Sequence, residues 1–180
     1  KVDFTILETG LGGRLDSVTA AKASIVLFTS ISYDHMSILG DSIESIALEK
    51  IGALSNKTEK IYSAEQASVV KKIFKKNAKK IHQKIYFTPT PRQPILQPKY
   101  LKGRHQIDNA HLAAQVLKNM NKEYNIKLLH IEQYINQTFW PGRIQYIRKT
   151  PDIIAVKYLQ LIWVVLDPIF LVICNLFTSK

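Results

Sequence analysis

Short apolar runs alternate with longer amphipathic stretches along most of this chain. Four short runs rich in β-branched or aromatic residues have the pattern of buried strands, and they lie at residues 2–9, 24–30, 60–64 and 84–88. Four longer stretches have the apolar spacing of helices, and they lie at residues 41–54, 65–80, 108–120 and 130–138. Strands that alternate with helices predict an α/β fold with a mainly parallel sheet flanked by helices.

Polar residues and prolines indicate where these elements begin and end. Asp41, followed three positions later by Glu44, resembles a capping box at the start of a helix. Asp108 or Asn109 is the predicted N-cap of a later helix. Two proline-containing segments are predicted to be a loop and a turn, at residues 88–98 and 139–143.

The C-terminal part of the chain has a different character. Residues 153–177 are almost wholly apolar and are interrupted by Lys157, Asp167 and Pro168. The length of this segment would allow a membrane span. A charge and a proline near its centre argue against a span, because an Asp at mid-bilayer costs a few kcal/mol.

Composition and charge narrow the class of protein only slightly. Among 180 residues there are 25 Lys and Arg against 14 Asp and Glu, a formal charge of +11. This excess favours anionic partners, although an abundance of lysine is also a general compositional bias. The single cysteine, Cys174, excludes an intramolecular disulfide and a cysteine zinc site, and it fits a reducing cytoplasm.

Residues 69–84 are strongly basic and carry seven lysines. Their apolar residues fall at helical spacing, which places the lysines on the opposite, solvated face. No recognisable nucleic-acid fold accompanies them, so nucleic acid is not an expected partner. The alternative function that this segment supports is a non-catalytic α/β binding module with a basic face, attached to a membrane if the apolar tail is a genuine anchor.

The glycine-rich stretch ETGLGGR fits neither common phosphate-binding loop. A P-loop needs GxxxxGK followed by Ser or Thr, and a dinucleotide fingerprint needs GxGxxG, whereas the glycines here are Gly10, Gly12 and Gly13. The stretch does place Glu8 at the carboxyl end of a predicted strand, where open α/β sheets bind ligands. A helix cap or a structural ion pair is the other interpretation of this carboxylate.

Two further ionisable residues are candidates for the same ligand-binding end of the sheet. His35 comes just after the second predicted strand, and Lys50 faces inward late in the 41–54 helix. Each has an ordinary structural explanation, as a packed histidine or a snorkelling lysine. Together with Glu8 they could converge on one end of the sheet.

Four sequence blocks, in order, resemble the folylpolyglutamate synthase/dihydrofolate synthase family of Mur-type ATP-dependent ligases. The blocks are LETGLGGRLD, TSISYDHMSILGDSIESIALEKIGAL, GRHQIDNAHLA and WPGR. The resemblance covers residues 1–147, and the second block is the most specific. It implies a central ATPase domain of the Mur-ligase type.

The resemblance implies a metal site. In the family, the residues that match Glu8 and His35 bind magnesium, and the lysine that matches Lys50 is carbamylated and becomes an oxygen ligand of a second metal. Such a set suits magnesium, which prefers hard oxygen donors and few protein ligands.

The resemblance also implies a nucleotide site and a reaction. The residue that matches Asn109 contacts adenine, with Gln106 nearby, and the residue that matches Arg143 contacts the ATP phosphates. A helix cap and a surface arginine are the ordinary alternatives for Asn109 and Arg143. The implied reaction joins L-glutamate to a folate or dihydropteroate carboxylate through an acyl phosphate, with ATP and Mg²⁺, in a cytoplasmic monomer.

Several departures from the family pattern shape the expected organisation. The family's GTNGKGS-type loop and its DGAHN motif are not found in this sequence, SVT follows GRLD where relatives have ATN, and Ser32 replaces a glycine. The predicted divisions are a partial ATP-binding domain, an interdomain linker and an apolar tail, at 1–140, 141–152 and 153–180. We expect the tail to be an out-of-frame translation from a broken gene, with a membrane anchor as the rival, and we expect this chain to be inactive alone.

Overall fold

The computed structural model describes residues 5–92, 96–124, 128–139, 145–149 and 152–155. These residues form two compact units that divide between Pro89 and Thr90. We call residues 5–89 the sheet unit and the described residues from Thr90 onward the helical unit. The predicted boundary between residues 140 and 141 lies outside the described residues, and the predicted division into domains stays a prediction.

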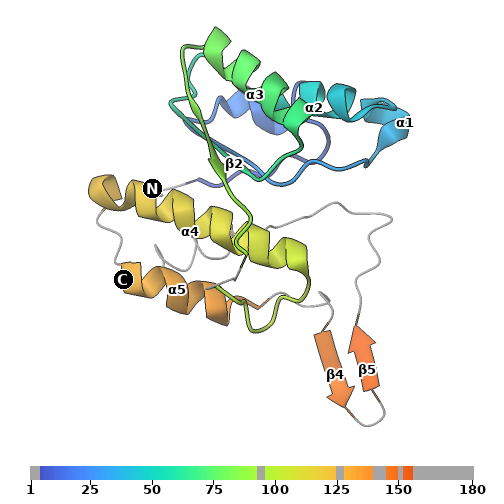
Figure 1. Ribbon diagram of the computed structural model, residues 1–180, viewed down its shortest axis with the longest axis vertical. Coiled ribbons are helices and arrows are strands. Elements are labelled where there is room, and N and C mark those ends of the chain that lie inside the picture. The colour runs from blue at the N-terminus through green and yellow to red at the C-terminus, as the bar shows by residue number, and fades with distance from the viewer. Residues whose placement is uncertain (1–4, 93–95, 125–127, 140–144, 150–151, 156–180) are drawn as a thin grey trace. The chain divides into compact units, whose positions relative to one another are not determined.

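Three parallel strands form the sheet of the sheet unit (Figure 1). They pair in the order β1-β2-β3, and their bounds are Ile25–Phe28, Lys60–Ala64 and Ile85–Thr88. Ile25 pairs with Lys60, and Ile61 pairs with Ile85, so successive strands are joined by crossovers through helices. The predicted α/β fold with a parallel sheet is confirmed.

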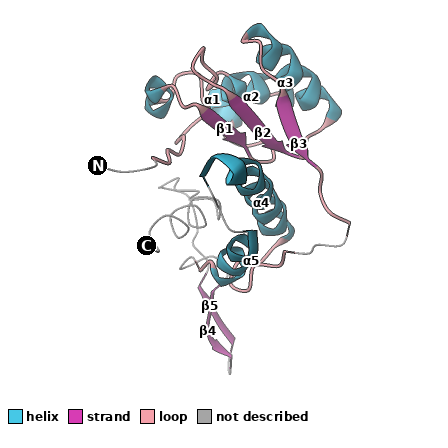
Figure 2. Ribbon diagram, turned by 90° about the vertical axis from the view of Figure 1, so that its left-hand side faces the viewer, coloured by secondary structure: helices cyan, strands magenta, loops and turns pink. Residues whose placement is uncertain are grey.

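Helices pack against one face of this sheet, as Figure 2 shows. The helical elements of the unit are η1, α1, α2 and α3, with bounds Ser17–Ala21, Met36–Leu39, Ile43–Ile51 and Ser68–Lys80. The core joins Phe28 and Ile61 of the sheet to Ala47 of α2 and Phe74 of α3. The Phe28 and Phe74 ring centroids are 4.7 Å apart. Burial of these apolar side chains holds the helices on the sheet.

Two details of the sheet unit differ from the predictions. Residues 5–9 of the predicted 2–9 strand are not part of a strand. The capping box of α2 is formed by Ser42 and Ser45, not by Asp41 and Glu44. The Ser42 hydroxyl accepts from the Ser45 backbone N–H at 3.1 Å, which starts the helix one residue later than an Asp41 cap would.

The helical unit contains two helices and a hairpin. Helices α4 (Arg104–Tyr124) and α5 (Leu128–Gln137) pack together, and β4 (Gln145–Lys149) pairs antiparallel with β5 (Asp152–Ala155). The loop that precedes α4 is anchored to the unit, because Leu101 is buried and the Lys99 backbone N–H donates to the Asn136 carbonyl at 3.2 Å.

The predicted N-cap of α4 at Asp108 or Asn109 is wrong, because both residues lie inside the helix. Gly103 adopts a φ of +109° just before the helix, and the Gln106 backbone N–H donates to the Gly103 carbonyl at 3.1 Å. Because glycine reaches this conformation without a Cβ clash, the chain turns into the helix at Arg104.

Within the described residues, no helix is long and apolar enough to cross a membrane. The apolar tail falls outside them beyond Ala155, so both interpretations of the tail stay predictions.

Candidate functional site

The glycine loop of residues 10–14 lies directly on the last turn of α2. The Arg14 backbone N–H donates to the Glu49 carbonyl at 2.9 Å. A Cβ on Gly13 would lie 2.6 Å from the Lys50 carbonyl oxygen, and a Cβ on Gly52 would lie 2.9 Å from the Arg14 Cα. The glycines therefore allow two backbones to touch, and the segment that carries Glu8 leads into a loop fixed against the helix that carries Lys50.

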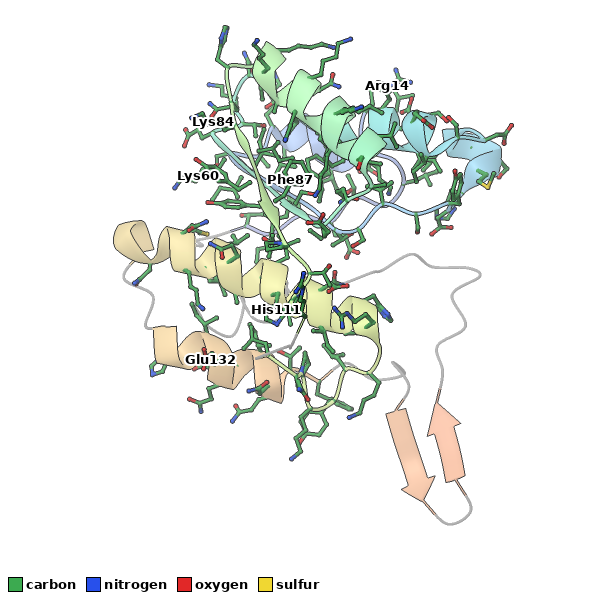
Figure 3. All side chains as sticks on the ribbon, in the orientation of Figure 1. Arg14, Lys60, Lys84, Phe87, His111 and Glu132 are labelled. Carbon is green, nitrogen blue, oxygen red and sulfur yellow. The ribbon has the colours of Figure 1, made fainter. Side chains whose placement is uncertain are left out.

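A salt bridge closes the same contact from the outside. The Arg14 guanidinium donates to the Glu49 carboxylate through Nη2 at 2.9 Å and Nε at 3.1 Å. Arg14 lies beside α2 in Figure 3. Because both groups are partly exposed, the pair is worth under about 1 kcal/mol, and its main effect is to orient the loop. Sequence reasoning did not find this pair, whose members are 35 positions apart.

Asp16 organises the loop from within. Its carboxylate accepts hydrogen bonds from the backbone N–H groups of Gly10, Leu11 and Val18, each at 2.9 Å. Burial alone would raise the pKa of Asp16, but these three hydrogen bonds favour the ionised form and bring the pKa below its usual value. The Thr19 hydroxyl donates to the Gly13 carbonyl at 2.6 Å, which fixes the close approach to α2.

His35 occupies a constrained position at the start of α1. It is the N-cap residue, with a left-handed φ of 52°, and α1 packs against α2. The backbone N–H of His35 donates to Asp34 Oδ1 at 2.9 Å, and the His35 Nε2 lies 3.8 Å from the same oxygen. A left-handed non-glycine residue is uncommon and is a frequent feature of functional sites.

Lys50 is half-buried near the end of α2. Burial lowers the pKa of Lys50, while the nearby carboxylate of Asp34 opposes this change by favouring the charged form. A lowered pKa increases the share of neutral amine, which is the form that reacts with carbon dioxide to give a carbamate. Asp34 therefore links the environments of His35 and Lys50, a role that sequence reasoning did not assign.

Gln66 is a second residue that sequence reasoning missed. It follows β2, is 7% exposed, and joins the carboxyl end of β1 to that of β2. Its Nε2 donates to the Thr29 carbonyl at 2.7 Å and to the Ser63 Oγ at 3.0 Å, and its Oε1 accepts from the Ile31 backbone N–H at 2.9 Å.

The three predicted metal ligands lie on adjoining segments of the sheet unit. Glu8, half-buried, precedes the glycine loop on α2, His35 begins the helix that packs on α2, and Lys50 belongs to α2 itself. Among the residues that the structure describes, no three His, Cys, Asp or Glu side chains converge as a metal site. The predicted set needs only two such residues. With Lys50 as a carbamate, it would offer the oxygen donors that Mg²⁺ prefers.

The predicted nucleotide-binding residues belong to the helical unit. Gln106 and Asn109 are buried on the first turns of α4, with exposed fractions of 2% and 9%. The Gln106 Nε2 lies 3.2 Å from the His105 Nε2, while the Gln106 Oε1 is buried and has no hydrogen-bond partner among the residues that the structure describes. Arg143 lies outside the described residues.

Comparisons with known proteins converge on one group of enzymes. No protein-family model matches the chain. The dihydrofolate synthase/folylpolyglutamate synthase of Bacillus subtilis is 30% identical over 176 residues, which cover 85% of this chain and 41% of that protein. A probable dihydrofolate synthetase of Schizosaccharomyces pombe is 26% identical over 84% of this chain and 40% of that protein.

Solved structures agree on the fold. The apo form of L. casei FPGS matches 83% of this chain and 42% of its own, with a TM-score of 0.73 at 20% identity. A structure titled FPGS-AMPPCP-folate complex matches 83% of this chain and 42% of its own, with a TM-score of 0.72 at 18% identity.

Proposed function

Because the chain belongs to the folylpolyglutamate synthase/dihydrofolate synthase family, we propose that it is part of an ATP-dependent ligase that joins L-glutamate to a folate or dihydropteroate carboxylate. The chain spans about 41% of the length of its B. subtilis relative, so the complete activity belongs to the whole protein. The complex of an FPGS with AMPPCP, an ATP analogue, and folate supports ATP and a folate as ligands. Glutamate as the second substrate, a monomeric state and a cytoplasmic location are further parts of this proposal.

The proposed reaction makes an amide in two steps. A carboxylate oxygen of the folate or dihydropteroate attacks the γ-phosphorus of ATP, which gives an acyl phosphate and releases ADP. The neutral amine of glutamate then attacks the acyl carbon, forms the C–N bond, releases inorganic phosphate and loses a proton. Magnesium, when bound, would offset the negative charge on the phosphates during the transfer.

Each predicted side chain has a defined part in this proposal. Glu8 and His35 would hold magnesium, and Lys50 as a carbamate would supply further oxygen donors. Gln106 and Asn109 would bind the adenine, and Arg143 would contact the phosphates.

The observation that carries the proposal is the backbone contact between the glycine loop and the end of α2. Gly13 and Lys50 touch without a side chain between them, so the loop that follows Glu8 is held against the helix that carries Lys50. The half-buried Lys50 with its lowered pKa supports the carbamate, because an ammonium group would repel a metal ion.

The proposal is tested by titration calorimetry of the full 180-residue chain with ATP, in the presence and absence of Mg²⁺ and bicarbonate. We expect Mg²⁺-dependent nucleotide binding that Glu8→Ala abolishes and that Glu44→Ala, an exposed carboxylate on α2, leaves intact. Carbon-13 NMR with labelled bicarbonate should show a carbamate signal that Lys50→Met removes. Nucleotide binding that Glu8→Ala leaves unaltered would contradict the proposal.

The alternative, a basic binding module, predicts a different result in the same titrations. Helix α3 presents exposed lysines, among them Lys72, Lys76 and Lys80, while its Val70 and Phe74 are buried against the sheet. Salt-sensitive binding to nucleic acid or acidic vesicles, lost in a Lys72, Lys76 and Lys80 triple glutamine variant and independent of Glu8, would favour this function.

A further inference from the structure

The backbone pairing between β1 and β2 stops at the end of β1, one residue before β2 ends. The last paired residues are Phe28 and Ser63, although β2 continues to Ala64. Beyond that point the Thr29 carbonyl and the Ile31 N–H face the side chain of Gln66. The two strands therefore separate at their carboxyl ends, the edge at which open α/β sheets bind ligands.

The Gln66 side chain continues the pairing in place of a strand. In a parallel sheet, one residue donates to a neighbouring carbonyl and accepts from the N–H group two residues further along. The Gln66 carboxamide does the same, donating to the Thr29 carbonyl at 2.7 Å and accepting from the Ile31 N–H at 2.9 Å. A side-chain amide offers a donor and an acceptor side by side on one planar group, as this pairing requires.

The remaining amide proton of Gln66 is also used. It is donated to the Ser63 Oγ at 3.0 Å, and the Ser63 hydroxyl donates in turn to the Ala64 carbonyl at 2.8 Å. Ser63 is fully buried and Gln66 is 7% exposed, so water does not compete for these bonds. The carboxamide is consequently held in one orientation.

We propose that Gln66 is a positioning residue, which fixes the loop from Thr29 to His35 and thereby sets the place of His35 in the metal site. This inference rests on the proposed function. The anchored Ile31 lies four residues before His35, and the His35 backbone N–H donates to the side chain of the preceding Asp34 at 2.9 Å. Outer groups that orient a metal ligand typically change metal affinity by tenfold or more when they are removed.

The test uses the full chain with Mn²⁺ as the probe, and the affinity is measured by electron paramagnetic resonance in bicarbonate buffer. Gln66→Leu removes all three hydrogen bonds, and Gln66→Glu keeps the size but removes both donors. We expect either change to weaken Mn²⁺ binding by about tenfold. His35→Ala identifies the signal that belongs to the proposed site.

Two controls separate positioning from stability. Ser63→Ala removes the third bond of Gln66 but leaves those to Thr29 and Ile31 in place. Val70→Ala removes two buried methyl groups from the core of the same unit and shows whether a general loss of stability alone weakens binding. We expect both control variants to keep the wild-type affinity for Mn²⁺. If Gln66→Leu does not fold, Gln66→Glu, which has the same size, decides the outcome.

The outcomes are distinct. Weaker Mn²⁺ binding in the Gln66 variants but not in the controls supports the proposal. Equal affinity in the Gln66 variants, with binding lost in His35→Ala, overturns the positioning role and leaves the metal site intact. If the wild-type chain shows no Mn²⁺ binding that His35→Ala removes, the proposed metal site fails and the role of Gln66 fails with it.

Discussion

Two polar side chains of the sheet unit, Asp16 and Gln66, are richly hydrogen-bonded, whereas several at the start of α4 in the helical unit are not. Beside the glycine loop, the carboxylate of Asp16 accepts three backbone hydrogen bonds. At the carboxyl ends of β1 and β2, the amide of Gln66 makes three of its own. At the start of α4, the buried Gln106 Oε1 and His111 Nε2 have no hydrogen-bond partner among the described residues, and Asp108 Oδ1 has only an ion pair with Arg104 at 3.7 Å. Buried polar atoms are nearly always bonded, so unused ones point to a ligand or water.

This difference in hydrogen bonding distinguishes the predicted metal site from the predicted nucleotide site. In the sheet unit, internal hydrogen bonds hold the predicted metal-binding segments in place, so changes there should cost stability. At the start of α4, the buried Nε2 atom of His111, a residue labelled in Figure 3, keeps its bonding capacity among the described residues. Burial lowers the pKa of His111, against an opposing effect of Asp108 and with further lowering by Lys118 and Arg104, so the imidazole tends to be neutral.

The largest expected effect tests the backbone contact of the sheet unit. In Gly13→Ala the new Cβ would lie 2.6 Å from the Lys50 carbonyl oxygen, so the loop or α2 must move. We expect the free energy of unfolding to fall by about 3 kcal/mol, measured by urea denaturation. Gly10→Ala is the matched control, because its Cβ would meet only the Asp16 Oδ2 at 3.5 Å. Equal stability of the two variants would show that the contact is not tight.

A smaller effect is expected from the hydrogen bonds inside the loop. Asp16→Ala leaves three backbone N–H groups without their acceptor and should cost about 1 kcal/mol, while exposed Asp41→Ala should cost little. The folded-state pKa of Asp16 lies below 3.8, the value in the unfolded chain. The contribution of Asp16 to the free energy of unfolding is therefore complete above pH 3.8 and is lost as the pH falls through the folded-state pKa. Urea melts between about pH 2 and about pH 7 measure this loss. A difference in the free energy of unfolding between Asp16→Ala and wild type that does not change with pH would contradict it.

Lys50 should show a pH dependence of the same sign as Asp16 but at higher pH, and as a group that costs stability when it is charged. Its folded-state pKa is lowered from 10.5, so the unfolded chain binds more protons between the folded value and 10.5, and stability rises with pH across that window. Lys50→Met should therefore be more stable than wild type at neutral pH, by less than the two preceding effects. Thermal melts in buffer free of carbon dioxide measure the difference, which should shrink as the pH approaches 10.5. A difference that grows with pH would be incompatible with this account.

The smallest change in stability is expected in the helical unit. Gln106→Met replaces a buried carbonyl oxygen that has no partner in the structure, so the free energy of unfolding should stay within about 0.5 kcal/mol. Nucleotide binding should weaken nonetheless, as measured by calorimetry. Gln115→Met, on an exposed position of the same helix, should change neither quantity. A clear loss of stability in Gln106→Met but not in Gln115→Met would show that Gln106 has a structural role, like Asp16 in the sheet unit.

The sequence predicts elements well where periodicity alone decides. The strand predicted at residues 60–64 has those bounds in the structure, and the apolar stripe predicted for α3 includes the buried Val70 and Phe74. The prediction of the capping residue of α2 was wrong because Asp41 and Ser42 are adjacent, and each has an acceptable capping-box partner three residues later. The spacing of residues in the sequence cannot show which of two adjacent residues caps the helix, because the backbone geometry decides this.

The candidate site, too, could be predicted only in part from the sequence. Motif order suggested Glu8, His35 and Lys50, and the structure locates these residues on adjoining segments. Gln66 and Glu49 were missed because each acts on a residue 35 or more positions away. Such partnerships depend on the packing of the fold and leave no local spacing that a single sequence could reveal.

The contact between the glycine loop and α2 also has an evolutionary consequence. Gly13 faces the backbone of Lys50, and Gly52 faces the backbone of Arg14, so each segment supplies the room that the other needs. A side chain gained at either glycine could be accommodated only by a compensating change across the contact. Substitutions in these two segments should therefore be epistatic, and the pair of segments is inherited as one unit.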